Sequence, residues 1–270
     1  MNRRGVIAVV RRDLSVALGS KAVVLPALIV PLVLLVLLPA GAGLVASVVD
    51  IATLGDLEVF LEALPASVVA DLPADPGLLA AELAVTYLLA PLVLLVPVMF
   101  AAVIAADGMA GEKERGTLEG LLLTPLSDRD IVLAKLLAAW VPATVIGVVG
   151  GIVYATVANL AVGLQVGRLV LPTTEFAVMV LWAGPTFAAA SLAAVSLVSV
   201  RVDTTQEAFQ LGGVVVLPVV GLLVSQATGV LLLSVWLLVI AGVVALAIAA
   251  GLLALGSRSL SRTGMGERLG

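Results

Sequence analysis

Residues 111–135 read GEKERGTLEGLLLTPLSDRDIVLAK and form a dense charged stretch between two long apolar segments. Apolar segments of that length cross membranes, whereas a run of charged residues is costly inside hydrocarbon. A water-exposed loop between two membrane helices is a place where a soluble partner can bind a membrane protein. The stretch therefore predicts two membrane helices joined by an exposed docking loop.

The rest of the chain is nearly all apolar. Its 270 residues are 62% hydrophobic and 12% charged, and the mean hydropathy is +1.26, whereas soluble domains are roughly 45–50% apolar. The apolar runs last about 20 residues or more, which is the length that crosses roughly 30 Å of hydrocarbon as a helix; a barrel strand needs about 10. We therefore expect an all-α integral membrane protein that contacts the lipid bilayer.

Six apolar segments predict six transmembrane helices in a single transmembrane domain, residues 1–270. The expected spans are 22–47, 77–110, 131–163, 174–200, 205–227 and 230–256. The last two are separated by the turn-like stretch 225–229, which suits either a tight hairpin or a re-entrant excursion.

The basic residues predict how these spans are oriented. If the N-terminus is cytoplasmic, thirteen of the 14 lysines and arginines lie on the cytoplasmic side and only Arg168 lies outside. Cytoplasmic loops of membrane proteins carry this excess of positive charge. We expect a multi-pass protein of the plasma membrane with both termini in the cytoplasm, an external loop at 48–76 and a cytosolic loop at 111–130.

Residues 1–21 are expected to form an amphipathic interfacial helix on the inner leaflet. Val6, Val10, Leu14 and Ala17 recur at helical spacing, while arginines take the opposite face. A basic segment that only sets the topology is the alternative, and both descriptions can hold together.

Short polar motifs predict where several helices begin and end. Asp75 precedes Pro76 as an N-cap, Ser127 stands three residues before Asp130, and Thr204 stands three before Glu207. Gly111 is the expected end of the second span. Between the second and third spans, residues 117–123 form a short amphipathic piece that Pro125 ends.

Absent residue types exclude several kinds of chemistry. The chain has no cysteine and no histidine, so it lacks thiol nucleophiles, imidazole bases and the usual zinc ligands. It also has no G-x-x-x-x-G-K-[ST] phosphate loop. We expect no catalytic residue, no metal site, no bound cofactor and no nucleic-acid partner. The acidic balance, with a pI near 4.8, suits a salt-loving host, and the carboxylates of the loop 48–76 are read as a solvated surface, with cation binding as the alternative.

One string of residues resembles a known family. Residues 112–119, EKERGTLE, followed by Leu121-Leu122, Thr124-Pro125 and Lys135, resemble the first cytoplasmic loop of ABC-2 type permeases, with Ala134 where that family has glycine. The resemblance implies a coupling helix that docks into a cleft of a nucleotide-binding ATPase subunit, which would hold ATP and Mg. It also implies pairing with a second permease, identical or related. The candidate docking residues are Glu112, Arg115, Gly116, Thr117, Leu118, Glu119, Leu121, Leu122 and Pro125.

Other interpretations remain open at this point. The loop 111–130 can be a solvated charged loop with its leucines on the membrane surface. Tyr154 and Asn159 are candidates for a substrate path, although polar side chains in membrane helices more often serve packing. An ion-coupled secondary transporter is disfavoured because no ionisable group lies near mid-membrane. A membrane enzyme of lipid metabolism is disfavoured because histidine, cysteine and a D-G-x-x-A-R cluster are all missing. The preferred function is a permease subunit that couples ATP hydrolysis in its partner to export or to a transmembrane signal.

Overall fold

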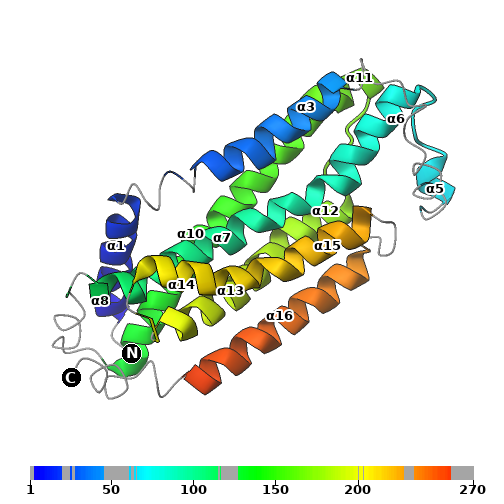
Figure 1. The fold of residues 1–270 in the computed structure, drawn as a ribbon. Helices are drawn as coiled ribbons and strands as arrows, with labels where there is room; N and C mark the ends of the chain where they lie inside the picture. The colour runs from blue at the N-terminus through cyan, green and yellow to red at the C-terminus, as the bar shows by residue number, and fades with distance from the viewer. Residues whose placement is uncertain are drawn as a thin grey trace.

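The computed structural model of the chain is a bundle of helices that run roughly along one direction (Figure 1). The structure describes residues 3–19, 25, 28–45, 61, 64, 66–114, 116, 127–199, 201–202, 204–227 and 234–256. Every regular element in these ranges is helical, which agrees with the predicted all-α class.

Four described helical stretches are long and apolar enough to cross a membrane: Pro76–Ala106, Asp130–Val166, Thr174–Ser199 and Val235–Leu255. Two shorter apolar helices, Leu28–Leu44 and Leu217–Gln226, fall within the expected first and fifth spans. The number of six spans stays a prediction.

The chain begins with α1 (Arg3–Gly19), which lies across one end of the bundle (Figure 1). Val9 of α1 is buried against Ile131 and Ala134 of α10. Ala134 thus lies fully buried at a helix contact that includes Val9. The expected contact of α1 with the inner leaflet stays a prediction. The first apolar segment follows as a π-helical stretch, η1 (Leu32–Leu37), and α3 (Leu38–Val45).

The second apolar segment changes its helical winding twice. After the short α5 (Ala66–Val69), the segment consists of α6 (Pro76–Leu83), a π-helical stretch η3 (Ala84–Leu88), a 3₁₀ stretch η4 (Ala90–Leu94) and α7 (Leu95–Ala106). The Asp75 carboxylate caps it by accepting from the Leu78 N–H at 2.9 Å, as predicted. Pro91 lies in the 3₁₀ stretch, because a proline cannot donate the backbone hydrogen bond of a regular α-helix.

The predicted end of this helix at Gly111 is wrong. A π-helical turn, η5 (Asp107–Gly111), leads into α8 (Glu112–Glu114), so the helical path continues past that glycine. Gly116 instead has a φ of 65°, in the left-handed region that glycine adopts without a steric clash. Its N–H donates to the Lys113 carbonyl at 3.1 Å. Contacts of the Glu112 side chain, described below, hold α8 against its neighbours.

The third segment is the longest helix. α10 (Asp128–Ala158) begins at Ser127, whose hydroxyl accepts from the Asp130 N–H as predicted, and continues through η6 (Asn159–Gly163) and α11 (Leu164–Val166). Neighbouring segments approach it at glycines: a Cβ built on Gly150 or Gly151 would lie 2.7 Å from Leu35 or Val180. Small residues allow this close packing between membrane helices.

The remaining helices complete the bundle. α12 (Thr174–Val178), the π-helical η7 (Met179–Ala183) and α13 (Gly184–Ser199) form the fourth segment, and α13 packs against α7, α10, α14 and α16. The fifth segment is α14 (Thr205–Gly212), the 3₁₀ stretch η8 (Gly213–Val216) and α15 (Leu217–Ala227). α16 (Val235–Gly256) is the sixth. The winding changes in the fifth segment between Gly212-Gly213 and Pro218, as expected for residues that weaken a regular helix.

Candidate coupling site and polar contacts of the bundle

The structure describes two of the nine predicted docking residues, Glu112 and Gly116. The other seven, Arg115, Thr117, Leu118, Glu119, Leu121, Leu122 and Pro125, lie outside the described residues, as does the amphipathic piece 117–123. The described part therefore shows how the candidate segment leaves the bundle at α8, near α1 (Figure 1).

Glu112 is buried between three helices. Its side chain is 4% exposed, and its carboxylate lies 2.6 Å from the Lys135 ammonium of α10 and 3.3 Å from the Arg12 guanidinium of α1. Lys135 is equally buried and also donates to the Gly108 carbonyl at 2.5 Å. Glu112 is one of the predicted docking residues. In the structure its contacts are within the chain, where charge-assisted hydrogen bonds join α8 to α1 and α10.

Glu114 makes a second connection to the bundle. Its carboxylate Oε2 accepts hydrogen bonds from the backbone N–H of Thr205 at 3.1 Å and from the Thr205 hydroxyl at 3.0 Å. Thr205 is the first residue of α14, and the preceding residue, Thr204, caps that helix by accepting from the Glu207 N–H, as predicted. A carboxylate at a helix N-terminus is favoured by the unpaired N–H groups and the helix dipole. The candidate segment is thus tied to α1, α10 and α14.

Tyr154, a candidate for the substrate path, lies in the core. Its side chain is fully buried, its hydroxyl donates to the Val85 carbonyl at 2.6 Å, and its ring stacks on Phe176 with centroids 5.7 Å apart. These contacts join α10 to the second and fourth segments.

Asn159 holds the connection that follows the third segment. Its amide nitrogen donates to the Leu171 carbonyl at 2.6 Å, and its oxygen accepts from the N–H groups of Val170 and Leu171. The polar groups of Tyr154 and Asn159 are therefore used for packing within the chain. Their predicted contact with a substrate stays a prediction.

An ion pair that was not predicted from the sequence lies at the end of the bundle opposite α8. Arg168 contacts Glu82 at 2.5 Å and also donates to the backbone carbonyl of Asp71. Glu82 is buried, with a side chain 7% exposed. Arg168 was already distinctive as the one basic residue expected on the external side, and a buried partner for it was a reasonable expectation, because charges within apolar segments are usually paired.

Comparison with known proteins agrees with this architecture. A search among curated proteins returned no match. A family model described as "ABC-2 family transporter protein" matches residues 7–254, which include all four long apolar helices except the last residue of the fourth. Because the match covers most of the chain, from within α1 into α16, this chain belongs to the ABC-2 family of transporter proteins.

Proposed function

We propose that this chain is the permease subunit of an ABC transporter and that its loop 111–130 docks a separate nucleotide-binding ATPase. ATP hydrolysis in that partner drives export of a substrate or a transmembrane conformational signal. The chain itself is non-catalytic, and ATP and Mg are held by the partner. Membership of the ABC-2 family supports the subunit assignment, and the residues of the loop support the dock.

The contacts at α8 are the observation that carries the coupling role. Glu112 and Glu114 lie directly before the loop that carries the leucines, and they bind α1, α10 and α14. A displacement of the loop is therefore passed to three helices at once, because ion pairs and hydrogen bonds of this kind keep the segment and the helices in register. Leu118, Leu121 and Leu122 supply the apolar anchor for a partner groove.

We further propose that two copies, or this chain and a related permease, form the membrane unit. In the single chain, α16 exposes apolar side chains such as Trp236, Ile240 and Val243, and α10 exposes Val145 and Ile152. Either lipid or a second permease can pack against these apolar faces. Chemical cross-linking in native membranes distinguishes a homodimer from a heterodimer.

The docking proposal is tested by changing Leu118, Leu121 and Leu122 together to serine. We expect the protein to remain inserted and folded but to lose its ATPase, because loss of a buried hot-spot side chain costs about 2 kcal/mol or more of binding free energy. The measurement is the affinity of the purified permease for the co-purifying ATPase, with folding checked by size-exclusion chromatography.

Two controls make this test specific. Changing Leu260 and Leu269 to serine alters leucines of the other predicted cytosolic segment and should leave the affinity unchanged. Changing Glu119 to lysine should weaken docking less than the triple change, since charges at the rim mainly affect association rate and salt dependence. Unchanged affinity in the folded triple variant would show that the loop is not the dock.

A further inference from the structure

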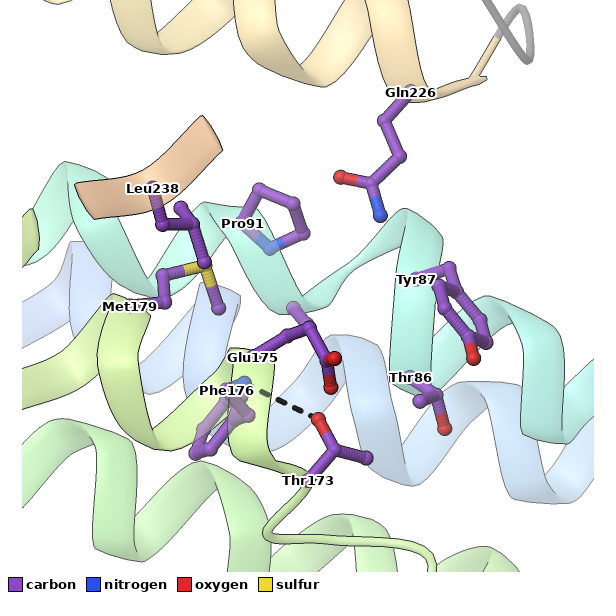
Figure 2. A pocket seen from close by; sticks show the side chains of 10 residues that line it. Thr86, Tyr87, Pro91, Thr173, Glu175, Phe176, Met179, Gln226 and Leu238 are labelled. Carbon is purple, nitrogen blue, oxygen red and sulfur yellow. Dashed lines mark hydrogen bonds between the residues drawn. The ribbon is translucent and has the colours of Figure 1, made fainter. Parts of the chain in front are cut away.

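A small pocket with both polar and apolar lining lies within the bundle at the end opposite α8. Its cavity volume is about 20 Å³, and segments two, four, five and six line it (Figure 2). The polar part of the lining consists of Thr86, Tyr87, Thr173, Glu175 and Gln226. If the predicted topology is correct, this is the external end of the bundle.

Two oxygens at this pocket are buried without a hydrogen-bond partner among the described residues: Oε1 of Gln226 and Oγ1 of Thr86. Gln226 is 2% exposed, and Figure 2 shows its amide extending from α15 toward the opposite wall, which carries Tyr87. A buried polar atom without a partner is costly, and native structures satisfy nearly all of them. The amide oxygen of Gln226 can only accept, so the pocket lacks a group that donates a hydrogen bond to it.

The chemistry of the lining limits what that group can be. Glu175 is the one charged residue among the described residues that line the pocket, so these residues favour a cation over an anion. The unpaired amide oxygen and the carboxylate are acceptors, and a threonine hydroxyl can also accept. A neutral hydroxyl supplies a single donor, and a guanidinium with its five donors is too large for this volume. A primary ammonium has three donors, no acceptor and about the size of one water molecule.

We propose that this pocket binds the primary ammonium group of an amphiphilic amine. Glu175 supplies the charge, and Oε1 of Gln226 accepts one of the three N–H bonds. Met179 and Leu238 belong to the apolar part of the same lining, where the alkyl chain of the amine can begin. The identification of such an amine as a transported substrate rests on the proposed function, whereas the binding itself does not.

The test uses the full chain in nanodiscs of zwitterionic lipid, with n-hexylamine at neutral pH as the probe. Saturable binding is measured by calorimetry and by the rise in unfolding temperature that a ligand of the native state produces. We expect Glu175→Gln and Gln226→Leu each to weaken hexylamine binding by about tenfold or more, the loss expected for a hydrogen bond to a charged group. Asp71→Asn removes an exposed carboxylate at the same end of the bundle, outside the lining, and should leave the affinity unchanged.

Three further probes separate the ammonium group from other sources of binding. n-Hexanol has the same chain without the charge, tetramethylammonium has the charge without N–H donors, and potassium chloride tests for an alkali-ion site. We expect none of the three to compete with hexylamine. Competition by hexanol would mean simple apolar partitioning, and competition by potassium would mean an alkali-ion site. An absence of saturable hexylamine binding would mean that the pocket holds only water. Each of these results would overturn the proposal.

A folding control accompanies the Gln226→Leu variant. Because this change removes a buried oxygen that has no partner, the unfolding temperature without amine should not fall. The ATPase is not needed for any of these measurements, so failure of amine binding is distinguishable from failure of the docking test.

Discussion

Among single residues, the buried charges of Glu112 and Lys135 are expected to have a large effect on the stability of this chain. Lys135 lies inside the bundle and forms an ion pair with Glu112. The side chain of each residue is 4% exposed. Leaving a buried charge uncompensated costs about 3–5 kcal/mol of stability, and each single replacement here removes the close 2.6 Å contact, while in Lys135→Met the Glu112 carboxylate keeps Arg12 at 3.3 Å. Replacing both by neutral side chains avoids that penalty, so the two positions should depend strongly on each other.

A double-mutant cycle measures this dependence. We expect the loss of unfolding free energy in the double variant to be smaller than the sum of the losses in Glu112→Gln and Lys135→Met, measured by SDS titration in mixed micelles. The double variant should regain part of the stability. If the two single losses simply add in the double variant, the residues do not interact in the folded protein.

At the opposite end of the bundle, the two members of the Glu82–Arg168 pair differ in exposure. The Glu82 side chain is 7% exposed and the Arg168 side chain 41% exposed. Arg168→Met should therefore be the more destabilising change, since it leaves a buried carboxylate unsatisfied at a cost of about 1–3 kcal/mol. Glu82→Gln leaves an arginine that can turn toward water. The unfolding free energies of the two variants give the order, and an equal or reversed order would contradict this account.

The sequence predicts local contacts at the residue scale but not the distant ones. The caps at Asp75, Ser127 and Thr204 are all confirmed, because a cap joins residues three apart and needs no knowledge of the fold. The Glu112–Lys135 pair joins residues 23 apart, and Glu82–Arg168 joins residues 86 apart. Helical periodicity identifies the face on which a residue lies, whereas the neighbouring helix that meets this face depends on the packing of the whole bundle.

At the scale of helices, close packing between α16 and the fourth segment depends on one glycine. A Cβ built on Gly242 would lie 2.3 Å from Nε1 of Trp182 and 3.0 Å from the Thr186 hydroxyl, so a side chain there cannot fit unless the Trp182 ring or α16 moves. The Trp182 indole N–H also donates to the Val239 carbonyl at 3.3 Å, which fixes the ring beside this glycine.

Gly242→Val should therefore loosen the docking of α16 and lower stability by about 1–3 kcal/mol, the usual cost of overpacking. Gly251→Val on the same helix is the matched control, because a Cβ there meets nothing within 4 Å and the position is exposed. Unfolding temperatures of the two variants in the same detergent provide the comparison. Equal unfolding temperatures would show that α16 does not pack on the fourth segment at this glycine.

Caps in the sequence account for where several helical paths begin. The fifth path starts beside the cap at Thr204 and runs from Thr205 to Ala227, so residues 225–227 of the stretch read as turn-like are helical. The second runs beyond Gly111 because the contacts of Glu112 hold one further turn against α1 and α10. A glycine is a frequent helix end but not an obligatory one, and here Gly116 adopts the left-handed conformation instead.

At the scale of the whole molecule, the apolar surface and the distribution of charge are those of a membrane protein. α16 and α10 keep wide apolar faces outside the bundle, and the helix ends carry the ion pairs. The two polar ends differ: one holds α8 beside α1, and the other holds Arg168 with Glu82. The basic residues predict the direction in which this bundle lies in the membrane, because thirteen of 14 fall in segments predicted to be cytoplasmic.

This orientation is tested with single cysteines, which are unambiguous probes because the chain contains none of its own. Ser67→Cys lies in the predicted external loop and Ser259→Cys in the predicted cytosolic tail. A membrane-impermeant thiol reagent applied to intact cells should label Cys at 67 and spare Cys at 259, whereas permeabilised cells should show labelling at both. Labelling at 259 in intact cells would invert the topology, and it would place the loop 111–130 outside, where no cytosolic ATPase can reach it.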